Sequence, residues 1–283
     1  GQATDGVALT GGASSAVVTI ADNERPGSLD PTFHPALTSG ERWQAGIHIT
    51  LQPDRKILIA GSFSAVGGIP RDGLARLNAN GSLDASFDPA RGLRTLPLNE
   101  PWLAFVSALA VQTDGKVLVH GGFISQSEES KPLDLVRLNQ DGSFDPTFAV
   151  APREAWFQNN GEGDFRSGLA VQTDGKILES SSPKVRRFNA DGSVDSSFEL
   201  IVQLDGSWTS VASTILVQDD GKAVIAGPFS GVNGVSRSRL ARLQPNGSLD
   251  DTFAPLIDGR VNAAVLEADG RILIAGDFYS VND

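Results

Sequence analysis

The residues of this chain that could do chemistry are mainly carboxylates at recurring places. The pattern N-x-[DN]-G-S-x-D occurs at 78–84, 139–145 and 189–195, and it resembles the oxygen-rich loops that bind Ca²⁺. It lacks the leading Asp and the distal bidentate Glu of such loops, and Asn, Asp and Gly also favour tight turns for conformational reasons. We therefore predict turns and no cofactor, with structural Ca²⁺ as the alternative. The weak metal candidates are Asp141, Asp145, Asp191 and Asp195.

An arginine stands eight residues before the last Asp of this pattern. Arg76 precedes Asp84, and the same spacing recurs from Arg137, Arg187 and Arg242. A basic and an acidic residue that face each other across a hairpin can pair. Since a catalytic group is usually needed once and this pair occurs in four copies, we predict a partly buried structural ion pair.

Residues for catalysis are sparse. The three histidines, His34, His48 and His120, lie in no metal or catalytic motif, and the absence of cysteine excludes thiolate chemistry. His120 interrupts an apolar run and is predicted to be a core or edge histidine. We predict that the chain is not an enzyme. A hydrolase that uses two acidic residues on a propeller face is the alternative, because sequence does not reveal the separation of two carboxylates.

The four tryptophans share one position. Trp43, Trp102, Trp156 and Trp208 lie 9, 10, 16 and 10 residues before a Gln that recurs in "VQTDGK" and its relatives. An exposed Trp suits the face of a sugar ring, whereas a buried Trp would fill the wedge between two repeats. Both readings stay open.

The elements that must position these residues are internal repeats. "AVQTDGK" stands at 110–116 and again at 170–176, and relatives give five copies. Each copy reads as a β-hairpin with an Asp-Gly turn, followed by a second hairpin of the type LARLNANGSLDASF at 74–87. Four short strands per repeat without a helical period predict an all-β propeller of four-stranded antiparallel blades, about five of them visible. A β-sandwich repeat array is the alternative. The copies lie near 47–87, 106–148, 168–198, 211–253 and 261–283.

The motif Q-x-D-G-K-[IV]-L-[IV]-x-G-x-F, followed by A-R-L-N-x-[DN]-G-S-L-D-x-[ST]-F, resembles the delta-60 repeat, a bacterial β-propeller repeat of undefined function. The resemblance covers 27–283. Residues 1–26 contain GGASSAVVTIADNE, which looks like the closing strand of a Calx-beta domain; this likeness implies an upstream stalk module on a large secreted protein. Alternatively, AVVTIADNERPGSLDPTF replaces a second hairpin and supplies the outer strands that the last copy lacks.

Alternation of strands in a blade places the Asp-Gly turns at one end and the connectors between blades at the other. The connector end also receives the segments 64–73, 124–134 and 230–239, which we predict to be long loops. Variable loops on a rigid scaffold are the usual place for binding. The predicted ligand-binding residues are Trp43, Trp156 and Trp208 for stacking, with Arg71, Glu128 and Arg237 as polar contacts.

Two copies depart from the pattern. Asp54-Arg55 replaces Asp-Gly in the first copy, and we expect this turn to differ, because a non-Gly residue at positive φ costs about 1 kcal/mol. In the third copy KILESSSPKVRRFN replaces the longer segment, which shortens the blade and places polar residues where apolar ones stood.

The composition of the chain narrows the classes of function that it can have. The net charge of −11 opposes binding to nucleic acid or anionic lipid, and no apolar run approaches the roughly 18 residues of a membrane span. We read the chain as part of a longer product whose other domains are its neighbours. We predict an extracellular or cell-surface bacterial module for binding or display, which adheres to carbohydrate or protein. The alternative is a purely structural spacer.

Overall fold

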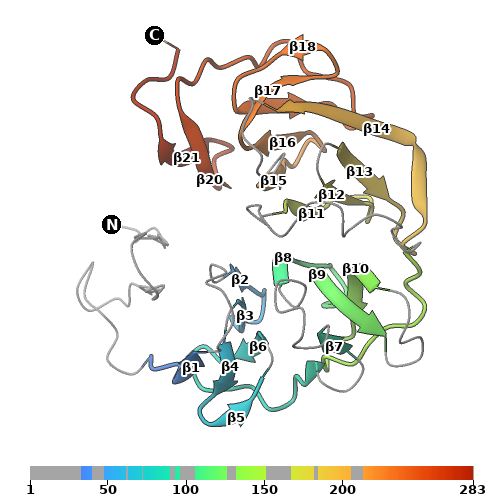
Figure 1. Ribbon diagram of the computed structural model, residues 1–283, viewed down its shortest axis with the longest axis vertical. Helices are drawn as coiled ribbons and strands as arrows, with labels where there is room; N and C mark the ends of the chain where they lie inside the picture. The colour runs from blue at the N-terminus through green and yellow to red at the C-terminus, as the bar shows by residue number, and fades with distance from the viewer. Residues whose placement is uncertain are drawn as a thin grey trace.

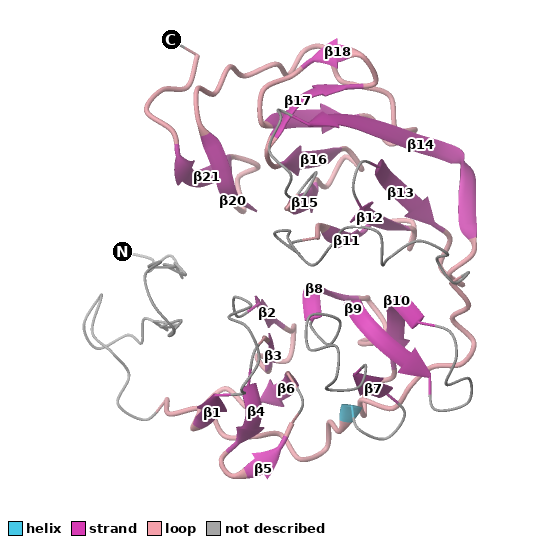
Figure 2. Ribbon diagram, in the orientation of Figure 1, coloured by secondary structure: helices cyan, strands magenta, loops and turns pink. Residues whose placement is uncertain are grey.

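The computed structural model describes residues 33–39, 48–61, 63–71, 73–89, 93–95, 106–125, 132–150, 167–181, 184–204 and 213–282. Within these ranges the regular elements are strands, apart from a short helical turn at Pro89 (Figure 2). All of the strand pairs are antiparallel.

Each of the five repeats begins with an antiparallel hairpin, as the sequence predicts. The first strands are β2 (His48–Leu51), β8 (Val106–Val111), β11 (Leu169–Val171), β15 (Thr214–Val217) and β20 (Arg260–Leu266). Their partners are β3 (Ile57–Ala60), β9 (Val117–Ser125), β12 (Ile177–Ser181), β16 (Ala223–Ala226) and β21 (Ile272–Asp277). The second strands are buried in the first four repeats because neighbouring blades cover both of their faces.

A third strand pairs with the second in four repeats. These strands are β6 (Leu74–Leu77), β10 (Pro132–Leu138), β13 (Lys184–Phe188) and β19 (Leu240–Leu243). The predicted fourth strand is reduced to a single bridge in three of them, such as Leu77 to Leu83. At this place the Asp84 carboxylate accepts a hydrogen bond from the Ser86 backbone N–H. The third repeat has the equivalent bond from Ser197 to Asp195, yet its strand continues.

The segments predicted to be long loops contain strands. Residues 64–73 contain most of the hairpin β4 (Phe63–Val66) and β5 (Ile69–Pro70), and 230–239 contain most of β17 (Phe229–Val232) and β18 (Val235–Ser236). β9 covers the first two residues of the third of these segments, 124–134, and the third strand of that blade, β10, begins at Pro132. The prediction was wrong because a partner strand arrives from the preceding repeat. The incoming strands are β1 (Leu37–Ser39), β7 (Leu93–Thr95) and β14 (Val194–Leu204).

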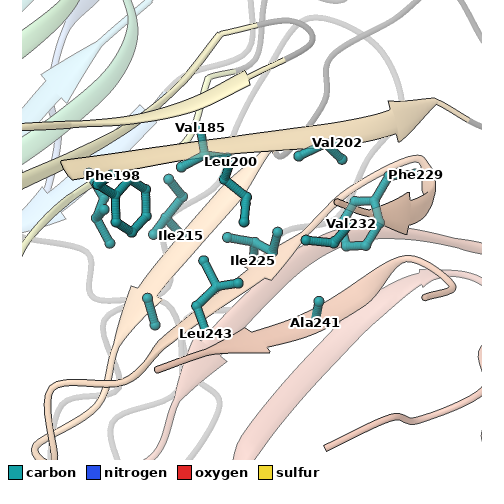
Figure 3. Packing of buried hydrophobic residues seen from close by; sticks show 12 residues of the cluster. Val185, Phe198, Leu200, Val202, Ile215, Ile225, Phe229, Val232, Ala241 and Leu243 are labelled. Carbon is teal, nitrogen blue, oxygen red and sulfur yellow. The ribbon is translucent and has the colours of Figure 1, made fainter. Parts of the chain in front are cut away.

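The repeats follow one another around an arc, with the first strand of each toward the centre (Figure 1). β2, β8, β11, β15 and β20 contact one another in that order. Most of the core clusters are shared by two neighbouring repeats. One of them packs Val185 and Leu200 of the third repeat against Ile225 and Leu243 of the fourth (Figure 3). These are the blades of a β-propeller, and the predicted fold class is confirmed.

Glycine is required where one repeat meets the next. Gly247 has a φ of 90°, and a Cβ there would lie 2.5 Å from the ring of Phe198, the residue that ends the preceding repeat. Gly192 has the same φ, and its added Cβ would approach Phe148 and Ala149 to 3.1 Å. The glycine in each second hairpin therefore serves the turn and the contact between blades.

The Asp54-Arg55 turn does not differ from the others, contrary to our expectation. Arg55 has a φ of 66°, close to the 79° of Gly115 in the second repeat. In both turns the N–H of this residue donates to the carbonyl of a Gln three residues earlier, at 2.9 Å. The surrounding hairpin imposes the left-handed conformation on an arginine.

Candidate functional site

The Asp-Gly turn end of the blades holds a repeated ion-pair network. In the second repeat, Asp145 Oδ2 accepts from Arg137 Nε and from Lys116 Nζ, each at 2.8 Å. Its Oδ1 accepts from the backbone N–H and the hydroxyl of Thr147 at 3.0 and 2.6 Å. The predicted pairing of Arg with Asp across the hairpin is confirmed. The same arrangement recurs around Asp84, Asp195 and Asp250.

The network also joins neighbouring blades. Arg137 Nη1 donates to the carbonyl of Ala190 in the third repeat at 2.7 Å, and its guanidinium lies 4.8 Å from the centre of the Phe148 ring. Arg76 and Arg187 make the equivalent bonds to Gln140 and Pro245. Since each arginine connects its own turn to the next blade, this network is a structural device of the ring.

The donors govern the protonation of these carboxylates. Burial opposes ionisation of Asp145, but hydrogen bonds from Lys116, Thr147 and Arg137 outweigh it and hold its pKa well below the usual range. At Asp195, hydrogen bonds from Lys176 and Ser197 dominate and lower the pKa against the effect of burial. All four repeated carboxylates therefore stay charged at neutral pH.

The four aspartates that were candidates for calcium binding accept hydrogen bonds from protein donors. Both oxygens of Asp145 and of Asp195 accept from cationic and hydroxyl donors within the network. Asp141 and Asp191 each accept from the N–H and hydroxyl of the serine two residues later, which fixes the turn. Within the described ranges, no group of three or more His, Asp or Glu side chains could hold a metal ion. The carboxylate oxygens of these aspartates are thus engaged within the turns and the network, and calcium binding by them stays a prediction.

A second polar cluster occurs only once among the described residues, between the second and third blades. His120 on β9 and Glu179 on β12 are 1% and 0% exposed, and His120 Nε2 lies 3.0 Å from Glu179 Oε1, at ion-pair distance without hydrogen-bond alignment. The Ser107 hydroxyl is 2.6 Å from His120 Nδ1. Arg186 Nη2 lies 3.1 Å from Glu179 Oε2 and 3.3 Å from Asp134 Oδ2. We call these five residues the interblade cluster.

Four members of the interblade cluster depart from the repeat. Superposing the repeats by sequence sets His120 and Glu179 at the positions of Ala60 and Ile59 in the first copy. Arg186 and Asp134 likewise replace Ala75 and Gly73. The ESSS run of the third copy and the lone His120 are both evident in the sequence, but neither indicates the other as its partner. The signal that could have found the cluster was the coincidence of charged replacements in two neighbouring copies.

The interblade cluster lies at the connector end of the blades. In the hairpin of β8 and β9, Val111 pairs with Val117 beside the Asp-Gly turn, whereas Ala108 pairs with His120 at the far end. Chemically, the order hydroxyl, imidazole, carboxylate is that of an activated nucleophile. Ser107 is only 2% exposed, so the closed structure gives it no contact with solvent-borne substrate.

The predicted ligand-binding residues are only partly described. Arg71 and Arg237 take equivalent places after β5 and β18, where each Nη1 donates to the preceding carbonyl at 2.8 Å. Their side chains are 10% and 11% exposed, so they are mostly packed against the hairpins. Trp43, Trp156, Trp208 and Glu128 lie outside the described residues, and their role stays a prediction.

The repeats match a family model described as a domain of unknown function (DUF5122) β-propeller. The matched residues are 52–87, 112–148, 172–198, 218–253 and 267–283, more than half of the chain. The chain belongs to this family. The DUF5122 assignment agrees with the predicted repeat propeller, whereas the delta-60 resemblance and the Calx-beta-like tail stay predictions. No curated protein matches the DUF5122 chain.

Solved structures similar to the DUF5122 propeller include a gluconolactonase from Xanthomonas campestris. It is 14% identical, with 86% of this chain and 85% of that chain covered and a TM-score of 0.45. The extracellular domain of a putative one-component system from B. thetaiotaomicron is 13% identical (86% and 27% covered, TM-score 0.44). PorZ, a surface component of the type-IX secretion system of Porphyromonas gingivalis, is 12% identical (89% and 35% covered, TM-score 0.43). The chain thus spans about a third or less of the last two proteins.

These matches correct one prediction. A second gluconolactonase, a putative one, is 13% identical with a TM-score of 0.41. Since the similar propellers include gluconolactonases, the prediction that the chain is not an enzyme, which rested on the lack of a catalytic motif, is wrong. At such low similarity the activity of those proteins does not transfer to the DUF5122 chain. In the described part of the chain, no helix is long and apolar enough to cross a membrane.

Proposed function

We propose that this DUF5122 propeller is a ligand-binding module of a large secreted or cell-surface bacterial protein, and that it recognises carbohydrate, or else a protein, through the connector end of its blades. The observation that supports this most is the contrast between the two blade ends. The turn end repeats one network in four copies, whereas the connectors that lead into the blades differ from copy to copy in length and sequence. A function served by one site requires such a departure from the repeat.

The scaffold fits this role. Arg137 and its equivalents fasten each blade to the next at the turn end, so the opposite end can vary in sequence without loss of the ring. The delta-60 resemblance supports a place in a longer extracellular bacterial protein. Trp43, Trp156 and Trp208 would supply faces for sugar rings.

A glycan array in calcium-containing buffer tests the proposal on the 283-residue chain. We expect reproducible binding to one sugar class, and a loss of affinity of about tenfold or more on Trp156→Ala or Trp208→Ala. The matched control is Asp219→Ala, which removes an exposed side chain from a turn at the opposite end. Unchanged affinity of both Trp variants would contradict the assigned face, and an array without binding would contradict carbohydrate as the ligand.

Hydrolysis is the second candidate function, because Ser107, His120 and Glu179 adopt the order of an activated nucleophile. Substrate would reach the Ser107 hydroxyl only after local separation of the second and third blades. Ester and lactone hydrolysis should then disappear in Ser107→Ala while the folded state, followed by circular dichroism, is retained. Equal rates in the two proteins would exclude this candidate.

A further inference from the structure

The fifth blade exposes a face that the other blades cover. The residues equivalent to Leu273 are fully buried in the first four blades, where they pack against the next blade along the arc. Leu273 itself is 58% exposed, and Val265 on the paired strand is 52% exposed. An apolar surface that four copies bury points to a missing cover in the fifth. The four buried equivalents are Leu58, Leu118, Leu178 and Val224.

The hydrogen-bonding edge of this blade is also open. Within the described residues, β21 pairs with β20 alone, whereas the second strand of each other blade also pairs with a third strand. Arg271 stands at the position of Lys116, the lysine that reaches the repeated carboxylate. It contacts Glu267 and Asp269 of its own turn at 3.1 and 2.7 Å and remains 74% exposed. The fifth blade therefore offers a strand edge and a cation to an acidic partner strand.

The first described residues behave like the end of a preceding repeat. A Cβ on Gly81 would lie 3.0 Å from the Phe33 ring, which repeats the contact of Phe198 with Gly247. β1 pairs with β4 on the first blade, as β14 pairs with β17 on the fourth. The chain thus enters the first blade as if another blade stood immediately before it.

The residues before Phe33 have the sequence of the missing strands. GSLDPTF at 27–33 matches the ends of the second hairpins, with Asp30 at the position of Asp84. The apolar run AVVTI at 16–20 can serve as a third strand. With AVVTI in the place of the third strand LARL at 74–77, Val18 stands where Arg76 stands in the first repeat, so a cation for Asp30 has to come from the fifth blade.

We propose that residues 16–33 form the third and fourth strands of the fifth blade and thereby close the ring, with Arg271 donating to the carboxylate of Asp30. The guanidinium can bind that carboxylate in a bidentate manner, which replaces the paired Lys and Arg of the other blades. Closure of the ring sets the first blade against Leu273, as the next blade covers the equivalent residue in the other four. It also continues the interface already made by Phe33 and β1. The segment then belongs to the propeller and is not the end of an upstream domain.

Crosslinking tests the proposal directly, because the chain has no cysteine. In the variant Asp30→Cys with Arg271→Cys, a short bismaleimide should give an intramolecularly linked monomer in high yield. The control variant, Asp30→Cys with Asp219→Cys, places the second thiol on the turn of the fourth blade and should give little of it. Equal yields in the two variants, or linked dimers alone, would overturn the proposal; dimers would mean that a second copy covers the face.

Charge reversal is an independent test. Arg271→Asp and Asp30→Arg should each lower the Tm by about 5 °C or more, and the double reversal should restore most of the loss. The control pair, Arg271→Asp with Asp219→Arg, should restore nothing. Additive losses in the Asp30 double variant would overturn the pairing even if both proteins fold.

Discussion

At the scale of single residues, Arg55 shows how a repeat tolerates an unfavourable side chain. Its φ of 66° is that of the glycines in the other turns, and it has the same hydrogen bonds. The conformational cost, about 1 kcal/mol for a side chain with Cβ in this region, is borne by the rest of the hairpin.

We expect Arg55→Gly to raise the Tm by about 2–4 °C, because the substitution removes that cost and Arg55 is exposed. Gly175→Ala is the matched control. Gly175 has a φ of 84°, and an added Cβ would meet only Ala190 Cβ at 3.8 Å, so the change in Tm should have the opposite sign and come from φ alone. Differential scanning calorimetry measures both; a lower Tm for Arg55→Gly would mean that the arginine stabilises the turn by another route.

Single and combined substitutions in the interblade cluster should differ in their effect on the free energy of unfolding. Glu179→Ile alone leaves Arg186 and His120 in a buried site without this carboxylate, which should cost about 3 kcal/mol. Restoring the residue types of the first blade at four positions together, by His120→Ala, Asp134→Gly, Glu179→Ile and Arg186→Ala, should leave stability equal or higher. Urea denaturation gives both values. If the fourfold variant is less stable than Glu179→Ile, the cluster is itself a major source of stability.

At the scale of elements, the repeated network makes the junction between hairpins sensitive to acid. The pKa of Asp84 is held below its usual range: burial would raise it, but hydrogen bonds from Lys56, Ser86 and Arg76 have the larger combined effect. A carboxyl group with a lower pKa in the folded state stabilises the fold above its unfolded pKa. This stabilisation is lost as the pH falls below about 4 toward the folded value.

We therefore expect the urea midpoint to be nearly flat between about pH 5 and 8 and to fall steeply below about pH 4. Asp145→Asn should lower the midpoint at neutral pH, because Lys116 and Arg137 lose their shared counter-charge. The difference from the unmodified chain should shrink as the pH falls and Asp145 of the latter is protonated. A difference that is constant from pH 7 to 3 would show that the charge of Asp145 is not the cause.

The elements were predictable from the sequence where the pattern is local. Asp-Gly turns between apolar runs identified the first hairpins, and the eight-residue spacing of Arg76 and Asp84 identified the ion pair. β4 and β17 each pair with a local strand, β5 or β18, and with a strand of the preceding repeat, and the spacing within one repeat does not reveal this second partner. His120 and Glu179 were missed as a pair because they lie in different copies, and only the packing of β9 against β12 brings them together. Contacts between repeats depend on blade geometry, which the spacing within one repeat does not contain.

At the scale of the whole molecule, stability is shared between neighbours. Leu58 of the first blade packs with Val117 and Val119 of the second, and Leu178 of the third packs with Ile225 of the fourth. A blade therefore has no complete core of its own. We expect the described arc to unfold in few cooperative steps, since the loss of one blade exposes the faces of two others.

The contact of His120 with Glu179 requires the third repeat to follow the second directly along the chain. Tandem repeats in a gene can gain, lose or exchange units by recombination between their similar copies. An exchange of the third unit for the fourth would bury His120 against Ile225 and set Glu179 beside a blade without a histidine at that place. Such rearranged chains would carry a buried charge without its partner and would fold poorly. Because rearranged chains would fold poorly, the contact of His120 with Glu179 favours genes that keep the second and third repeats in their present order.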